Sequence, residues 1–215
     1  MSVLLSVSLV LWISFVILSV VFAIFMTKKF LLSDLEPAQR DYFLGLVLFI
    51  LIHMVSRIFY ILYDFYWIDG SQYILFWDIA AAIGTASLIF LLFAIERHII
   101  KKTKFLFTIL SIITVCLYFI IYEYRNIVQL FMIPVVAIVI PAIYIYTAIK
   151  STGEVRKNSL IIAMGLIVFI LGQAAHSINI WDIFTYDTAF FLYFIASPIG
   201  LLIGGLLLFY GLMKT

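Results

Sequence analysis

The sequence predicts an all-α polytopic membrane protein with seven transmembrane helices. Of its 215 residues, 67% are hydrophobic and 11% are charged, whereas soluble domains are about 25% charged. Seven apolar segments reach or approach the roughly 20 residues that cross a bilayer. They are residues 3–26, 42–63, 73–96, 105–122, 127–149, 159–181 and 189–213. The segments and their short links fill the chain, so we expect a single transmembrane domain over residues 1–215.

The first segment, residues 3–26, has the position of a signal peptide but not its pattern. No positive charge precedes it, and Lys28 and Lys29 follow it. At about 24 residues it is also longer than the apolar part of a usual signal peptide. We therefore expect a retained helix whose N-terminus lies outside the cell.

The basic residues indicate the orientation of the helices. Eleven of the 13 Lys and Arg residues fall in the first, third and fifth links or at the C-terminus. These eleven are Lys28, Lys29, Arg40, Arg97, Lys101, Lys102, Lys104, Lys150, Arg156, Lys157 and Lys214. By the positive-inside rule, we expect these links and the C-terminus on the cytoplasmic side of the cell membrane. The charge gives no reason to expect a nucleic-acid partner, whereas the cluster at 101–104 fits anionic lipid headgroups of the bilayer.

The second segment carries four polar residues on one predicted helix face. His53, Arg57, Tyr60 and Asp64 recur at spacings of four, three and four. An arginine inside a membrane is rare and is almost always paired or hydrated. We expect Asp78, early in the third segment, to be its partner. Three interpretations stay open: a salt bridge that locks the two helices, a site for an anionic or polar ligand, and snorkelling of Arg57 to the interface.

The third and seventh segments carry small residues at helical spacing. Ala80 and Gly84 are four residues apart, as are Ala196, Gly200 and Gly204 in the seventh segment. Such spacing lets helix backbones approach closely.

The fourth segment contains the single cysteine, Cys116, which is expected to be a small buried side chain.

The sixth segment ends in an unusually polar stretch, "GQAAHSINIWD" at residues 172–182. Gln173, His176 and Ser177 fall within about 60° of a common direction on a helix, and we expect Gln173 and His176 to face the protein interior. Asn179 and Asp182 belong to the membrane interface, where Trp181 anchors the chain.

Two pairs of segments indicate an internal repeat. "GLVLFIL" (45–51) aligns with "GLIVFIL" (165–171), and "IAAAIG" (79–84) aligns with "IASPIG" (195–200). We predict a parallel 3+1+3 repeat, with helices 1–3 in residues 1–104, a connector helix in 105–126 and helices 5–7 in 127–215. In this alignment Gln173 corresponds to His53, which places polar side chains at equal depth in both halves.

Together these patterns predict a ligand-binding cluster and no catalytic site. The cluster comprises His53, Arg57, Tyr60, Asp78, Gln173 and His176. We expect no enzyme, because the sequence lacks GxSxG and HExxH motifs. Asp78 and Glu96 lie about 27 Å apart along one helix, too far for acid–base catalysis. We expect neither a metal nor a cofactor, since His53 and His176 are not equivalent in the repeat.

Two known groups share parts of this pattern. With seven helices and the stretch "FAIERH" (93–98), the chain resembles rhodopsins and G-protein-coupled receptors, which carry a Glu/Asp-Arg-Tyr motif at the cytoplasmic end of helix 3. Here His98 replaces the tyrosine. No lysine occurs within the seventh segment, so bound retinal is not expected. In length and in its 3+1+3 repeat the chain is similar to SWEET and PQ-loop transporters, although the Pro-Gln motif is missing.

The sequence therefore favours a receptor- or sensor-like protein with an outward-opening polar pocket for a small ligand. Two alternatives remain: a SWEET-like transporter of a small polar solute, and a structural subunit of a larger membrane complex. Because the cytoplasmic links are short, a sensor of this size is expected to signal through a membrane partner or through a homo-oligomer.

Overall fold

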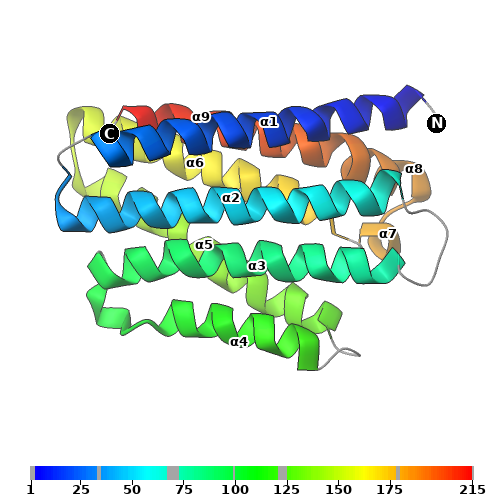
Figure 1. The fold of residues 1–215 in the computed structure, drawn as a ribbon, viewed down its shortest axis with the longest axis horizontal. Coiled ribbons are helices and arrows are strands. Elements are labelled where there is room, and N and C mark those ends of the chain that lie inside the picture. Colours follow the sequence, from blue (N-terminus) through cyan, green and yellow to red (C-terminus); the bar gives the residue numbers. More distant parts are fainter. Residues whose placement is uncertain are drawn as a thin grey trace. The chain divides into compact units, whose positions relative to one another are not determined.

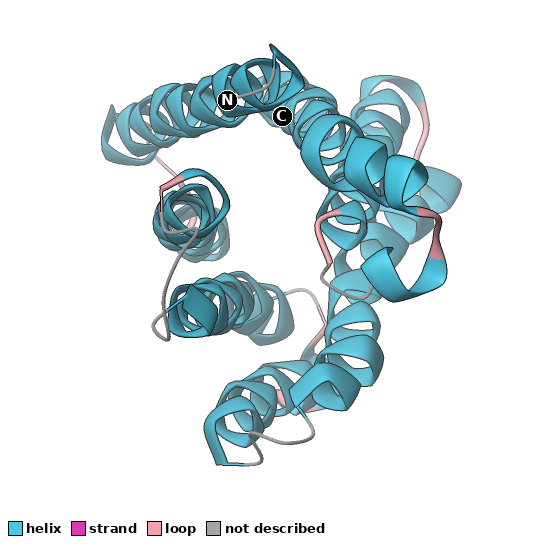
Figure 2. Ribbon diagram, turned by 90° about the vertical axis from the view of Figure 1, so that its right-hand side faces the viewer, coloured by secondary structure: helices cyan, strands magenta, loops and turns pink. Residues whose placement is uncertain are grey.

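The structure is a computed structural model of the chain. It describes residues 3–32, 35–66, 73–98, 100–120, 125–177 and 180–214, without the side chains at 32, 73, 74 and 125–137. This part of the chain is helical and contains no strand (Figure 2). The long helices are α1 (Val3–Leu32), α2 (Pro37–Phe65), α3 (Tyr73–His98), α4 (Leu106–Ile120), α5 (Arg125–Lys150), α6 (Gly153–Ala175) and α9 (Ser197–Met213). The short ones are η1 (Lys101–Thr103), α7 (Ile180–Ile183), α8 (Tyr186–Phe191) and the π-helical turn η3 (Leu192–Ala196).

Five described helices are long and apolar enough to cross a membrane. They are Val3–Leu31, Pro37–Phe65, Leu75–His98, Gly153–Ala175 and Tyr186–Met213, the last formed by α8, η3 and α9 together. Two shorter apolar helices, Leu106–Ile120 and Ile138–Lys150, coincide with the fourth and fifth predicted segments. An all-helical membrane protein is therefore confirmed, while seven crossings and their orientation remain predictions.

The sixth helix differs from the predicted segment 159–181. It begins six residues earlier, at Gly153, and ends at Ala175. Apolar patterning missed its start because the first turns are polar, yet Glu154 suits the positive end of the helix dipole. At the other end the N–H of His176 turns back to the Gln173 carbonyl. Ser177 therefore lies beyond the helix, and its expected place on a helix face is wrong.

By Cα packing, the chain divides into two compact units. Residues 19–136 form one, here called the α2–α4 unit. Residues 1–18 and 137–215 form the other, the α6–α9 unit. Each unit has a close helix pair at its centre and is described by itself.

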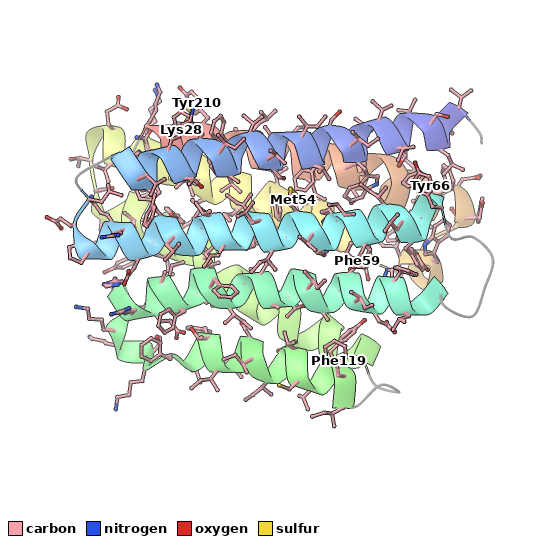
Figure 3. The ribbon with its side chains drawn as sticks, in the orientation of Figure 1. Lys28, Met54, Phe59, Tyr66, Phe119 and Tyr210 are labelled. Atoms are coloured by element: carbon pink, nitrogen blue, oxygen red, sulfur yellow. The ribbon has the colours of Figure 1, made fainter. Side chains whose placement is uncertain are left out.

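In the α2–α4 unit, α2, α3 and α4 run antiparallel to their chain neighbours (Figure 1). A Cβ added at Gly45 of α2 would lie 2.8 Å from the Phe90 carbonyl oxygen of α3, so a side chain has no room there. Farther along the same contact between α2 and α3, Ser56 Oγ donates a hydrogen bond of 2.6 Å to the Ala80 carbonyl. Lys28 and Tyr66 mark opposite ends of this unit (Figure 3).

In the α6–α9 unit, glycines bring α6 and α9 into backbone contact. A Cβ at Gly172 would lie 2.8 Å from Leu201 N, and one at Gly204 would lie 2.6 Å from Phe169 N. The close approach expected from the small residues of the seventh segment is thus confirmed. The first half of α1 packs on the same pair, with the Phe15 ring 6.0 Å from the Phe169 ring.

The π-helical turn η3 has a cause in the sequence. Pro198 has no N–H, and its ring clashes with the carbonyl four residues earlier in a regular helix. The chain widens instead, and the Ser197 N–H bonds to the Leu192 carbonyl five residues before it. Such turns inside membrane helices are frequent at functional sites.

The expectation that Cys116 is buried is wrong, because its side chain is exposed. The buried face of α4 is formed by Ser111, Thr114 and Tyr118, with Thr108 one turn earlier. Residue 116 lies on the opposite face of this stripe, where an apolar thiol suits lipid.

Candidate functional site

The α2–α4 unit holds a buried polar group, here called the arginine cluster: His53, Arg57, Tyr60, Asp78 and Tyr118. All five are buried, and Arg57 is 0% exposed. Four of them were predicted from sequence, and the one-face spacing of the α2 members is confirmed. Placing a guanidinium, a carboxylate and an imidazole in one apolar bundle is costly unless they satisfy one another or a ligand.

Arg57 and His53 are joined along α2. The Arg57 Nε–H donates to His53 Nε2 over 3.3 Å. Since Nε2 accepts this bond, the imidazole is neutral and carries its proton on Nδ1. The imidazole ring is also stacked on Phe49, with the ring centres 5.5 Å apart.

On its other side, Arg57 lies over an aromatic ring. Its Cζ is 4.9 Å from the centre of the Tyr60 ring, within the range of a cation–π interaction. Tyr60 in turn meets Trp77 of α3 edge to face at 6.1 Å. The guanidinium is therefore oriented by an imidazole and by a phenol whose own position α3 fixes.

Asp78 is held from α4. The Tyr118 hydroxyl donates to Asp78 Oδ1 over 3.0 Å, so α3 and α4 are connected inside the bundle. Sequence reasoning missed Tyr118. The available signal was the spacing of Ser111, Thr114 and Tyr118, which marks one polar stripe on an otherwise apolar helix. The predicted Arg57–Asp78 ion pair stays a prediction.

The α6–α9 unit holds a second group, here called the histidine cluster: Trp12, Gln173, His176, Tyr193 and Ser197. His176 is 1% exposed and is packed between two rings. Trp12 meets it edge to face at 4.7 Å, and Tyr193, within the π-helical turn, stacks on it at 4.2 Å. Only Gln173 and His176 were predicted. The missed signals were Pro198 and the lone tryptophan in the first half of α1.

Other buried polar atoms lie in the same unit as this imidazole. Ser8 Oγ, Gln173 Oε1 and Ser197 Oγ are buried and have no hydrogen-bond partner within the described part of the chain. Leaving such atoms unsatisfied costs about 1–3 kcal/mol each. Groups of this kind are usually satisfied by water, an ion or a ligand.

The six predicted site residues thus fall into two groups. His53, Arg57, Tyr60 and Asp78 belong to the arginine cluster, whereas Gln173 and His176 belong to the histidine cluster. That all six share one pocket stays a prediction. Among the described residues, no three His, Cys, Asp or Glu side chains are grouped to hold a metal ion.

The residues Glu96, Arg97 and His98 of "FAIERH" tie three helices together at the end of α3. Arg97 and His98 both reach Asp41 Oδ2 of α2, at 3.1 Å and 2.8 Å. Glu96 accepts the backbone N–H groups of Phe107 and Thr108 at 3.0 Å and 2.7 Å. A carboxylate at the N-terminus of α4 satisfies donors that the helix itself cannot, and it complements the helix dipole.

Comparison with known proteins adds no relative: no protein family, no curated protein and no solved structure matches the chain. The function is therefore argued from the two clusters alone.

Proposed function

We propose that this chain is a receptor- or sensor-like membrane protein whose arginine cluster binds a small anionic or polar ligand through an outward-opening pocket. The observation that carries the proposal is Arg57, fully buried about two turns before the end of α2 and oriented by His53 and Tyr60.

The chemistry of the guanidinium supports ligand binding. Arginine presents five N–H donors in a planar fork that matches carboxylate and phosphate groups bidentately. One of these donors is directed at His53, which sets the plane in which the guanidinium meets a ligand. A buried ion pair is by itself weak evidence for stability, because apolar residues of similar volume often do as well.

A sensor is favoured over a transporter because the two aligned helices are not interrupted at matching points. Rocking of two repeats calls for matching flexible points. The π-helical turn before Pro198 interrupts the last helix, whereas the aligned stretch of α3, which has Ala82 in place of the proline, is regular α-helix. In the repeat that a transporter requires, Gly45 aligns with Gly165, and each abuts the backbone of a neighbouring helix. The repeat itself stays a prediction.

Ligand-dependent unfolding of the purified protein tests the proposal. The panel contains small carboxylates, inorganic phosphate and neutral polar solutes, added to wild type, Arg57→Gln and the control Ile58→Ala, whose side chain is exposed. A ligand at 100 times its Kd stabilises by about 2.7 kcal/mol, a rise of several degrees in unfolding temperature. We expect such a rise for wild type and Ile58→Ala and none for Arg57→Gln. If no solute distinguishes Arg57→Gln from wild type, the proposal is contradicted.

Flux into liposomes distinguishes the alternatives. A solute that stabilises the protein but does not cross the bilayer with it supports a sensor. Saturable flux of that solute, abolished by Arg57→Gln, would favour the SWEET-like transporter instead. The structural-subunit alternative predicts neither stabilisation nor flux.

A further inference from the structure

The link between α3 and α4 presents three lysines from an ordered turn. Lys101, Lys102 and Lys104 are all exposed. The turn is held by the N–H and the hydroxyl of Thr103, which both donate to the Ile100 carbonyl at 3.1 Å and 2.8 Å. The backbone then reverses through two left-handed residues, Lys104 and Phe105, with φ of 49° and 63°. Three ammonium groups are therefore gathered on one short, structured segment.

The described acidic groups beside these lysines already have other partners. Asp41 is held by Arg97 and His98. Glu96 accepts two backbone N–H groups of α4 and the Thr108 hydroxyl. The positive charge of the lysines is therefore directed outward, toward whatever lies beyond the end of the helices.

Exposed apolar side chains begin where the lysines stop. Phe105 is 39% exposed, Leu106 51% and Ile109 48%. The Phe105 ring stacks on Phe93 of α3 at 5.4 Å, and Phe93 is itself 44% exposed. Large apolar surfaces of this kind on membrane helices face acyl chains. We therefore expect the lysines at the level of the lipid headgroups.

Further cations lie at the same end of the α2–α4 unit, where α1 ends and α2 begins (Figure 1). Lys29 Nζ lies 5.1 Å from the Phe43 ring centre, and Arg40 Cζ lies 5.4 Å from that of Phe30. Aromatic contacts hold these two side chains near the helix ends, and they extend the positive surface.

We infer that Lys101, Lys102 and Lys104 form a binding site for the phosphate of an anionic glycerophospholipid. The ammonium groups bind the headgroup phosphate, while Phe105 and Leu106 contact the adjoining acyl chains. Free phosphate shares the headgroup chemistry but lacks the acyl chains, so it is expected to bind far more weakly. This site is independent of the arginine cluster and of the proposed function.

Titration of the purified protein in a neutral detergent tests this inference, with bound lipid counted by native mass spectrometry. The probes are phosphatidylglycerol, phosphatidylcholine and inorganic phosphate. The test variant is Lys101→Gln/Lys102→Gln/Lys104→Gln, and the charge-conserving control replaces the same three lysines with arginine. A second control, Arg156→Gln/Lys157→Gln, removes two exposed cations from α6 in the other unit.

We expect wild type to prefer phosphatidylglycerol over phosphatidylcholine. The glutamine triple variant should lose that affinity about a hundred-fold, since each of the three basic residues contributes about 1 kcal/mol and about 1.4 kcal/mol corresponds to ten-fold. The arginine triple variant and the α6 control should keep it. Unfolding without added lipid should match wild type in all variants, because the changed side chains are exposed. Three results would each overturn the inference: no preference for phosphatidylglycerol in wild type, an equal loss in the α6 control, or binding of inorganic phosphate as tight as that of the lipid.

Discussion

Arg57 Nε and His53 Nε2 lie 3.3 Å apart, one turn along α2, in the interior of a membrane bundle. This bond makes the imidazole an acceptor and fixes the plane of the guanidinium. It predicts that His53 is needed for the position of Arg57 and not only for filling space.

Replacing His53 tests this coupling. His53→Leu removes the acceptor and should lower the free energy of unfolding by about 1–3 kcal/mol, the cost of an unsatisfied buried donor. His53→Gln keeps an acceptor and should lose less. Thermal unfolding in detergent measures both. Equal losses for the two variants would mean that Arg57 does not depend on this bond.

The expected partnership of Arg57 with Asp78 has its own test. Arg57→Leu should destabilise the protein by about 3–5 kcal/mol if it leaves a carboxylate buried and uncompensated. Asp78→Asn in the Arg57→Leu background should then restore part of the loss. A double variant no more stable than Arg57→Leu alone would rule Asp78 out as the partner.

Two adjacent glycines of α9 are expected to respond differently to the same change. Gly204→Ala places a Cβ 2.6 Å from Phe169 N and 2.8 Å from the Gly165 carbonyl, so it should destabilise by about 1–3 kcal/mol through overpacking. Gly205→Ala meets only side chains, the nearest at 3.4 Å, and should be neutral or slightly stabilising because alanine favours helix. Unfolding temperatures that do not separate the two variants would argue against the backbone contact of α6 and α9.

The carboxylates at the end of α3 offer a second matched comparison. Glu96→Ala leaves two backbone N–H groups and one hydroxyl at the start of α4 without their acceptor. It should lower the free energy of unfolding by about 1–3 kcal/mol. Asp41→Ala breaks ion pairs whose side chains are 54% and 20% exposed on α3, so we expect the smaller loss, as for most surface pairs. The order of the two unfolding temperatures checks this, and the reverse order would contradict it.

The predicted orientation is tested by labelling in cells. The exposed native thiol is first replaced by Cys116→Ser, and single cysteines are then introduced as Thr185→Cys and Thr103→Cys. The positive-inside rule predicts that residue 185 reacts with an impermeant thiol reagent and residue 103 does not. Labelling at 103 in intact cells would reverse the orientation. Position 70, which the sequence predicts to react like residue 185, lies outside the described residues.

Single residues show which parts of the fold are predictable from the sequence. The faces of α2 were predicted well, since the spacing of His53, Arg57 and Tyr60 is set by helix geometry. The polar start of α6 was missed because hydropathy records only where a helix is apolar. The π-helical turn was not anticipated either, although Pro198 was visible, because a proline indicates a break and not how the chain accommodates it.

Contacts between helices were the least predictable part. Tyr118 meets Asp78 across 40 residues of sequence, and Trp12 meets His176 across a still longer separation. Periodicity tells which side of a helix is buried, but not which neighbour it meets. For this reason the sequence identified the α2 members of the arginine cluster and missed their partner on α4.

The most direct test of the account is the accessibility of the arginine cluster to water. In the Cys116→Ser background, His53→Cys is treated with an anionic and with a cationic methanethiosulfonate reagent, and lipid-facing Ile58→Cys serves as the control. We predict that residue 53 is modified, faster by the anionic reagent because Arg57 is adjacent, and that residue 58 is not. If residue 53 stays unmodified while Thr185→Cys reacts, the cluster is a closed structural lock and the ligand site proposed for it is wrong.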